Sequence, residues 1–259
     1  QCMSATDTPN IMKKFIKWLA IILGVLLVAF AIAYLIFNEP LPTGKKGPEA
    51  DALARKMLMA VDKDGWDTTT VVQWSFMGLH DYLWDKDRNL VQITWSDKKV
   101  LLDPDEISGK AWENGVEQSE EDAAATVRTA WNYWCNDSFW FNAVVKCFDP
   151  GTSRSIVTME DGSEALLVSY DSGGVTPGDS YLWILDENGL PKSWKMWVKI
   201  IPIGGVEFSW EQWKTLPTGA KVASLHDGAV FDLEISEIKG AHSLEAFGLT
   251  ADPFAPIAE

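Results

Sequence analysis

Basic residues are few in this sequence: 22 lysines and arginines stand against 37 aspartates and glutamates in 259 residues. The formal charge of −15 argues against nucleic acid as a partner, because proteins that bind phosphate backbones carry a basic surface. Hydrophobic residues still make up 47% of the chain, which is too apolar for a disordered protein. The composition therefore predicts a folded, acidic protein whose partners are proteins or apolar ligands.

Side chains suited to catalysis or metal binding are also scarce. The three histidines, His80, His226 and His242, have no metal-ligand spacing with one another. The sequence has no HExxH, GxSxG or GxGxxG motif and no phosphate-binding loop. His80 and Asp81 would pair as a base with an orienting acid, although such neighbours more often lie in a solvated turn. We therefore expect no enzymatic activity, no metal and no cofactor, with a His80–Asp81 hydrolase as a third alternative.

Only three cysteines occur, which limits both disulfides and thiol chemistry. Cys2 lies before the long apolar segment rather than after it, so it does not fit the lipid-modified cysteine of a lipoprotein. Cys135 and Cys147 would be able to pair in an oxidising compartment, with a gain of about 3 kcal/mol if the geometry permits. Two buried free thiols are the alternative, because cysteine is among the most buried residue types.

One long run lacks charge altogether. Residues 18–37 (WLAIILGVLLVAFAIAYLIF) contain no charged and no strongly polar side chain. A helix of this length reaches roughly 30 Å, the thickness of the hydrocarbon core of a bilayer. A cleaved signal peptide is the alternative, because residues 31–33 (AIA) resemble a cleavage site. We favour a retained anchor, since signal segments are shorter and cleavage would leave residues 34–37 as an exposed apolar stub.

Lysines on either side of the span predict its orientation. Three lysines precede it within residues 1–17 and two follow it, so the short arm at residues 1–17 is expected in the cytoplasm. The span would then lie in a bacterial inner membrane, with the large domain in the periplasm. Met12 looks like a natural start, so residues 1–11 are expected to be an extension.

Small residues recur at helical spacing inside the span, with Ala20 followed by Gly24 and Ala29 followed by Ala33. Small residues four apart let two membrane helices approach closely, although they are common in any transmembrane helix. These four positions are the candidate contacts with a partner helix.

The segment after the span changes in pattern twice. Residues 38–47 (NEPLPTGKKG) are rich in proline and glycine, as in a linker. Residues 48–62 place apolar residues on one face of a helix. From residue 68 apolar and polar residues alternate, and polar turns at residues 85–89 and 96–98 predict an antiparallel meander. The first turn begins like an EF-hand loop but lacks its later glycine and glutamate, so we interpret it as a hairpin turn.

The second half begins with a helical insert. Residues 119–122 (SEED) form a capping-box pattern that predicts a helix from about residue 120 to residue 134. Residues 136–138 (NDS) are expected to break it, and a second short helix would run through Phe141 and Val145.

Hairpin turns and loops punctuate the remainder. Asp-Gly or Asn-Gly pairs at residues 161–162, 188–189 and 227–228 predict hairpins between further strands. The loop at residues 172–179 (SGGVTPGD) would form an anion nest or a calcium cage, but a strand connection with positive φ at its glycines is preferred. Residues 250–259 contain two prolines and little pattern, so an extended tail is expected.

Tryptophan is the residue in excess, with 14 copies. Most of these rings are expected to fill the core between sheet and helices. Trp194 and Trp197 are three residues apart, so on a regular strand they face opposite sides. Trp131, Trp134 and Trp140 cluster on the helical insert, and for them a partner or cavity surface is kept as an alternative.

The order of elements resembles a known superfamily. A helix, a run of hairpins, a helical insert and further hairpins over roughly residues 47–249 are similar to the lipoprotein carriers of LolA/LolB type. Residues 134–141 (WCNDSFWF) and 172–183 (SGGVTPGDSYLW) look like signatures of uncharacterised members of such families. The resemblance implies a curved, incompletely closed sheet that wraps around helices and encloses an apolar cavity. Soluble carriers lack a retained anchor, so the resemblance implies cavity binding more than shuttling between membranes.

The sequence thus predicts an α+β fold: one transmembrane helix at residues 18–37, then a large, curved antiparallel sheet of half-barrel shape packed against a few helices at residues 48–249. We predict a non-enzymatic accessory or scaffolding subunit of a larger membrane complex, with other membrane subunits and the bilayer as partners. The alternative is binding of a lipid, an acyl chain or another apolar ligand in the half-barrel.

Overall fold

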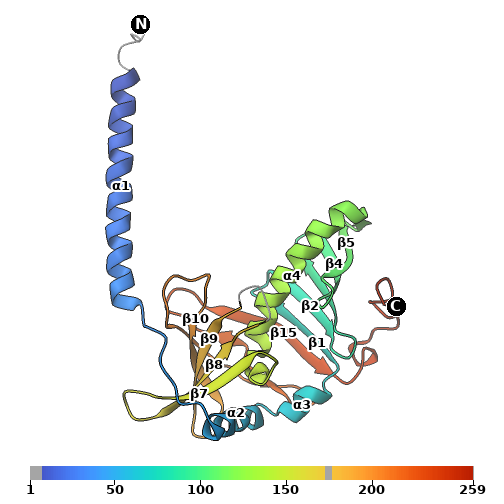
Figure 1. Ribbon diagram of the computed structural model, residues 1–259. Helices are drawn as coiled ribbons and strands as arrows, with labels where there is room; N and C mark the ends of the chain where they lie inside the picture. The colour runs from blue at the N-terminus through green and yellow to red at the C-terminus, as the bar shows by residue number, and fades with distance from the viewer. Residues whose placement is uncertain (1–7, 173–176, 259) are drawn as a thin grey trace.

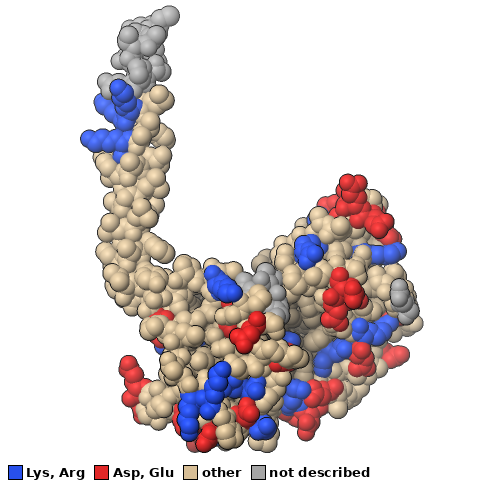
Figure 2. All heavy atoms as spheres, in the orientation of Figure 1, with Lys and Arg blue, Asp and Glu red and all other residues tan. Residues whose placement is uncertain are grey.

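A long N-terminal helix stands apart from a folded domain in the computed structural model, which describes residues 8–172 and 177–258 (Figure 1). This helix, α1 (Thr8–Phe37), contains the segment Met12–Phe37, which is long and apolar enough to cross a membrane. Its most apolar stretch is not buried against the rest of the protein. Figure 2 shows basic side chains near the N-terminal end of α1 and no charged side chain along the rest of its visible surface. The expected apolar helix is therefore present, and it begins before residue 18.

Two short helices follow the span. α2 (Pro48–Ala60) begins with a proline at its first position and buries Ala54 and Met57 on one face. Asp62 then turns the chain in the left-handed conformation, with φ of 54°, and its side chain caps α3 (Lys63–Thr68). The helical face predicted for residues 48–62 is thus the face that covers the core.

The larger sheet has eight antiparallel strands in the order β14-β15-β1-β2-β3-β4-β5-β6. Apolar residues alternate along it as predicted, so that Val72, Trp74 and Phe76 share the inner face. The strands are β1 (Val71–Phe76), β2 (His80–Asp85), β3 (Leu90–Trp95), β4 (Lys98–Asp103), β5 (Ser108–Glu113), β6 (Val116–Glu117), β14 (Leu225–His226) and β15 (Leu233–Ala241).

The smaller sheet has five antiparallel strands in the order β11-β10-β9-β8-β7, and β12 (Lys214–Thr215) pairs separately with β13 (Lys221–Val222). Trp194 lies in the main core while Trp197 packs into a separate cluster on the other face, as their spacing predicted. The strands are β7 (Thr152–Thr158), β8 (Glu164–Tyr170), β9 (Asp179–Leu185), β10 (Pro191–Trp197) and β11 (Val206–Ser209).

The helical insert forms one long helix, α4 (Glu120–Asn142), followed by the 3-10 helix η1 (Ala143–Lys146). Ser119 caps α4 as predicted, because its hydroxyl accepts a hydrogen bond from Asp122 N at 3.3 Å. The break expected at residues 136–138 was wrong. Asp137 and Ser138 are buried, and the Asp137 carboxylate is bound by side chains of other residues instead of competing for the local backbone.

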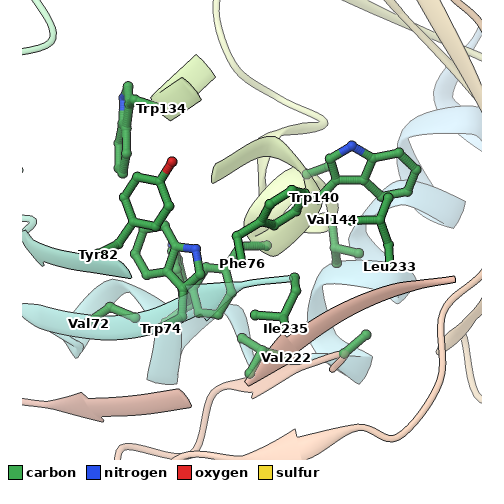
Figure 3. Packing of buried hydrophobic residues seen from close by; sticks show 14 of the residues in the cluster. Val72, Trp74, Phe76, Tyr82, Trp134, Trp140, Val144, Val222, Leu233 and Ile235 are labelled. Carbon is green, nitrogen blue, oxygen red and sulfur yellow. The ribbon is translucent and has the colours of Figure 1, made fainter. Parts of the chain in front are cut away.

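α4 crosses the inner face of the larger sheet and reaches the smaller sheet with its C-terminal half (Figure 1). Trp74 lies at the centre of the resulting core, stacked at 4.6 Å between the rings of Tyr82 and Phe141. Figure 3 shows the Trp74 ring beside that of Tyr82. On the second sheet Trp194 contacts Phe139 and Trp140 of the same helix. The predicted α+β architecture is confirmed: in the described part of the chain the strands form two large sheets and one two-stranded pair, and neither large sheet closes into a barrel.

The C-terminal segment folds back onto the outer face of the larger sheet. It contains the short 3-10 helix η2 (Glu245–Phe247) and then a series of turns. Phe254 is fully buried there among Val71, Leu83, Leu90 and Leu101. Asp252 forms a bidentate pair with Arg88 at 2.6 and 2.9 Å. The segment expected to be an extended tail is therefore docked on the sheet.

Candidate functional site

A buried carboxylate lies at one end of the aromatic core. Asp137 on α4 accepts hydrogen bonds from His80 Nδ1 and from the Tyr82 hydroxyl, both at 2.6 Å. Its second oxygen accepts a hydrogen bond from Asn136 Nδ2 at 2.8 Å. The Asp137 side chain is only 3% exposed. Three donors satisfy the hydrogen-bonding capacity that a buried carboxylate requires. The carboxylate thereby connects the start of β2 to the C-terminal half of α4.

The hydrogen bond to Asp137 fixes the orientation of the His80 ring. Because an ionised carboxylate only accepts, Nδ1 carries a proton and the opposite nitrogen, Nε2, points away from the carboxylate. The ring stacks on Tyr133 at 4.0 Å, and Trp95 meets Tyr133 edge-on at 5.6 Å. The His80 side chain remains 15% exposed. The His80 ring therefore bridges the Asp137 carboxylate and the ring of Tyr133.

Burial keeps Tyr82 in its protonated form. Desolvation, together with the neighbouring Asp137 charge, raises the pKa of Tyr82 well above its usual value. Tyr82 is therefore a permanent hydrogen-bond donor to Asp137 and not an acid that would titrate near neutral pH.

The histidine pairing suggested by the sequence does not form. Asp81, adjacent to His80, is exposed and borders a hollow of about 260 Å³ together with Gln92 and Leu249. Successive strand residues face opposite sides, so Asp81 points away from the core that contains His80. In the part of the chain that the structure describes, no group of three or more His, Cys, Asp or Glu side chains could hold a metal ion.

The three tryptophans of the helical insert face the protein rather than solvent. Trp134 and Trp140 are 8% and 9% exposed and pack in the main core. Trp131 is half-buried, and its Nε1 donates to the carbonyl oxygen of Pro104. The rings therefore join α4 to the sheets, and a partner would meet little of their surface.

Cys135 and Cys147 are both free thiols in the structure. Cys147 is buried, and Cys135 is half-buried against the main core. Burial raises the pKa of Cys135 to about 11 and that of Cys147 to about 12. Neither thiol is in a form that reacts readily near neutral pH.

Part of the loop predicted at residues 172–179 lies outside the described residues, which exclude 173–176. At its end, Asp179 is buried, and its carboxylate accepts a hydrogen bond from Lys199 N at 3.0 Å. This carboxylate therefore joins the loop to the connection between β10 and β11.

The C-terminal end of α1 is held against the smaller sheet by several hydrogen bonds. Glu39 N donates to Gly204 O at 3.0 Å, and Gly204 N donates to Asn38 Oδ1 at 2.9 Å. Trp197 Nε1 donates to the Glu39 carbonyl at 2.8 Å. The Glu39 carboxylate pairs with Lys195 Nζ at 2.7 and 2.8 Å. The first residues after the span are therefore bound directly to the end of β10, and we name this set of contacts the anchor clamp.

A glycine is required in the anchor clamp. A Cβ on Gly204 would lie 2.7 Å from the Glu39 carbonyl oxygen, and it would also overlap the Trp197 ring. Further along, Lys45 exchanges backbone hydrogen bonds of 2.8 and 3.0 Å with Ile156 on β7, the edge strand of the sheet. Residues 38–47, which resemble a linker in composition, thus follow the domain surface and cover an exposed edge.

The small residues of α1 remain accessible, with Ala20, Gly24 and Ala29 exposed and Ala33 partly exposed. Among the described residues, nothing lies within 4 Å of a Cβ built on Gly24. At about 100° per residue, the pair Ala20 and Gly24 faces away from the pair Ala29 and Ala33. α1 therefore presents two separate small-residue faces, and each would admit a close neighbouring helix.

A second histidine, His226, is buried with no charged partner among the described residues. His226 is fully buried, with its Nδ1 at 3.0 Å from the carbonyl oxygen of Ser209 and its ring 4.4 Å from that of Trp210. A carbonyl only accepts, so Nδ1 carries the proton of a neutral ring. Burial lowers the pKa of His226 from 6.5 to about 4.

We expect acid to destabilise the protein through His226. Between pH 6.5 and pH 4 the unfolded chain binds a proton that the folded chain does not, so stability falls as the pH is lowered. The shift from 6.5 to about 4 predicts a loss of roughly 2–3 kcal/mol between pH 7.5 and pH 4.5. Urea unfolding at the two pH values measures it. His226→Asn should lose this component, whereas His242→Asn, at an exposed histidine, should retain it; equal pH dependence of both variants would contradict the prediction.

Sequence reasoning missed Asp137 and the anchor clamp for different reasons. The run 136–138 has the residue types of a helix break, and only the partners contributed by β2 show why it remains helical. The clamp joins Glu39 to Trp197, which are far apart in the sequence. A tryptophan and two lysines close together at residues 195–199 resemble the residues that flank membrane interfaces, which is the one signal that pointed to this end of β10.

No family model matches the chain, and no curated protein matches it. Among solved structures, the chain is similar to a DUF1329 family protein from Desulfovibrio piger. The similarity covers 78% of this chain and 97% of that protein, with 11% sequence identity and a TM-score of 0.39. The carrier-like binding implied by the sequence resemblance remains a proposal.

Proposed function

We propose that this protein is a non-enzymatic, single-pass membrane subunit whose folded domain serves as an accessory or scaffolding part of a larger membrane complex. The domain would lie on the periplasmic side of a bacterial inner membrane, because more lysines precede the span than follow it.

The anchor clamp is the observation that carries this proposal. One backbone hydrogen bond, one hydrogen bond from Gly204 N to the Asn38 side chain, an indole hydrogen bond and an ion pair hold Asn38 and Glu39 against the end of β10. A domain fixed to its anchor at the first residue after the helix keeps one orientation relative to the membrane. A scaffold needs such an orientation, whereas a carrier that moves between membranes does not.

The exposed faces of α1 support the same proposal. Membrane helices associate through close packing at small residues, and among the described residues the rest of the chain does not bury the apolar stretch of α1 that carries them. A partner helix at Ala20 and Gly24 would place its own domain next to the clamped domain.

Substitution of Gly24 tests the proposal in native membranes. Gly24→Leu should weaken retention in the complex by about tenfold, because helix contacts of this kind are worth about 1–2 kcal/mol. Native gel electrophoresis and mass spectrometry after mild detergent extraction measure that retention. Leu23→Phe, which adds bulk between the two small-residue faces, is the matched control and should be retained. A wild-type chain that migrates only as a monomer would overturn the proposal.

Binding of an apolar ligand in a half-barrel receives less support from the geometry. The inner face of the larger sheet is filled by stacked rings, with Trp74 between Tyr82 and Phe141. The hollow of about 260 Å³ beside Asp81 and another of about 440 Å³ near Leu244 and Asp252 border the docked C-terminal segment instead. A lipid would have to displace several buried aromatic side chains to enter the core.

A further inference from the structure

We infer that the connection between β10 and β11, residues 198–205, rests in the lipid interface and gives the domain a second contact with the membrane beside its span. This inference requires α1 to cross the bilayer but does not require a partner complex. The occupant is the lipid surface itself, since the connection is bonded to the first residues that leave the membrane helix.

The position of this connection follows from the anchor clamp. Gly204, near its end, exchanges hydrogen bonds with Asn38 and Glu39, and Trp197, just before it, binds the Glu39 carbonyl. Phe37 is the last residue of α1. The connection is therefore hydrogen-bonded directly to the residues that follow the apolar helix. The interface of a bilayer begins where such a helix ends.

The shape of the connection presents an apolar tip. Ile201 N donates to Val198 O at 3.1 Å, and the resulting turn places Lys199 and Ile200 at its apex. Val198 and Ile201 pack against the core, whereas Ile200 is 72% exposed. A large aliphatic side chain at a turn apex makes no contribution to the core of the domain, so its apolar surface is available to lipid.

The neighbouring residues are those that favour an interface. Trp197 has an apolar ring and a bonded indole N–H, and Leu41, just beyond the clamp, is 49% exposed. Figure 2 shows an uncharged surface along the C-terminal part of α1 and one group of basic atoms on the adjoining edge of the domain. Because the domain as a whole is acidic, contact through apolar side chains fits better than attraction to anionic lipid.

The opposite end of the domain provides a matched reference. Lys56 on α2 binds the carbonyl of Glu187 in the turn between β9 and β10, at the end of β10 remote from the clamp. Met59, also on α2, is 73% exposed, almost the same as Ile200. α2 lies at the bottom of the domain in Figure 1, away from the foot of α1. Met59 should therefore remain in water when Ile200 meets the membrane.

Fluorescence quenching in vesicles tests the inference on the full chain. Cys2 is replaced by serine, and an environment-sensitive thiol label is attached to Ile200→Cys or to Met59→Cys; the raised pKa values of Cys135 and Cys147 limit labelling at those sites near pH 7. The chain is reconstituted in phosphatidylcholine vesicles that contain a phospholipid with a nitroxide near the top of its acyl chain. We expect quenching at Ile200→Cys to exceed that at Met59→Cys by about threefold or more, because interfacial side chains enter roughly 5–10 Å into this region.

Two outcomes would overturn the inference. Weak quenching at both labels would place the tip of the turn in water, and equally strong quenching at both would show that contact with the membrane is not specific to the tip. In neither case would retention of the chain in a membrane complex change, so failure here is distinct from failure of the proposed scaffold function. A chain labelled at Leu41→Cys provides a further test. Addition of Ile200→Asp should reduce the quenching of this label by about half if the tip of the turn holds the domain against the membrane.

Discussion

Asp137→Ala should be among the most destabilising single substitutions in this protein. Removal of the carboxylate leaves the Tyr82 hydroxyl and His80 Nδ1 without their acceptor in a site where the aspartate is only 2% exposed. Breaking a buried charged network by removing one partner costs about 3–5 kcal/mol. Asp137→Asn keeps the shape and one acceptor oxygen, so a loss of about 2 kcal/mol is expected for it. Urea unfolding of the full chain in nanodiscs, followed by tryptophan fluorescence, measures both values.

The matched control is the aspartate next to His80 in the sequence. Asp81→Asn changes an exposed side chain on the outer face of β2, so its effect should stay within about 0.5 kcal/mol. If Asp81→Asn proved as destabilising as Asp137→Asn, the pairing of His80 with Asp137 would be contradicted. The chemical shifts of the His80 ring provide a second reading, because they should change with Asp137→Asn and not with Asp81→Asn.

Parts of the fold that depend on local pattern were predictable. The apolar run at residues 18–37 forms a helix, and the alternation from residue 68 forms a meander, because burial of one face imposes a period of two on each strand. Ser119 caps its helix because the interaction involves only residues within one turn. These features need no knowledge of distant residues.

Features that depend on distant partners were not predictable in the same way. Asp137 has the character of a helix breaker until Tyr82 and His80 provide donors for its carboxylate. The C-terminal segment has the composition of an extended tail until Phe254 finds an apolar site on the outer face. In each case the free energy of a tertiary contact determines the local conformation. A single sequence does not show which distant residues form such contacts.

The division of the strands between two sheets belongs to the same class. Hairpin turns fix which neighbours pair along the chain, but β15 pairs with β1 across most of the sequence. That long-range pairing adds β15 and β14 to the larger sheet next to β1, the first strand of the meander. β7 to β11 form the second sheet. Alternating apolar and polar residues fit one sheet or two equally well. The sequence therefore predicted antiparallel strands but not their division between two large sheets.

Trp74 links these elements, and its substitution should be comparable in effect to that of Asp137. The ring is fully buried on β1 and stacks on Tyr82 of β2, with an interplanar angle of 12°, and on Phe141 of α4, with an angle of 6°. Trp74→Ala removes both stacked contacts and leaves a cavity, at a cost of about 3–5 kcal/mol. Trp112→Ala, at a half-buried ring on the outer face, should cost about 1 kcal/mol and is the control.

Trp74→Phe distinguishes ring packing from the indole N–H. Within the described residues Trp74 Nε1 has no hydrogen-bond partner, and burial of an unpaired donor costs about 1–3 kcal/mol. Phenylalanine keeps a flat ring between Tyr82 and Phe141 and removes that unpaired donor, so the lost volume is partly offset. We expect Trp74→Phe to cost less than about 2 kcal/mol in the same urea experiment. Equal losses for Trp74→Phe and Trp74→Ala would mean that the stack contributes little, and that the inner face of the sheet is held together by α4 through Asp137 rather than through its rings.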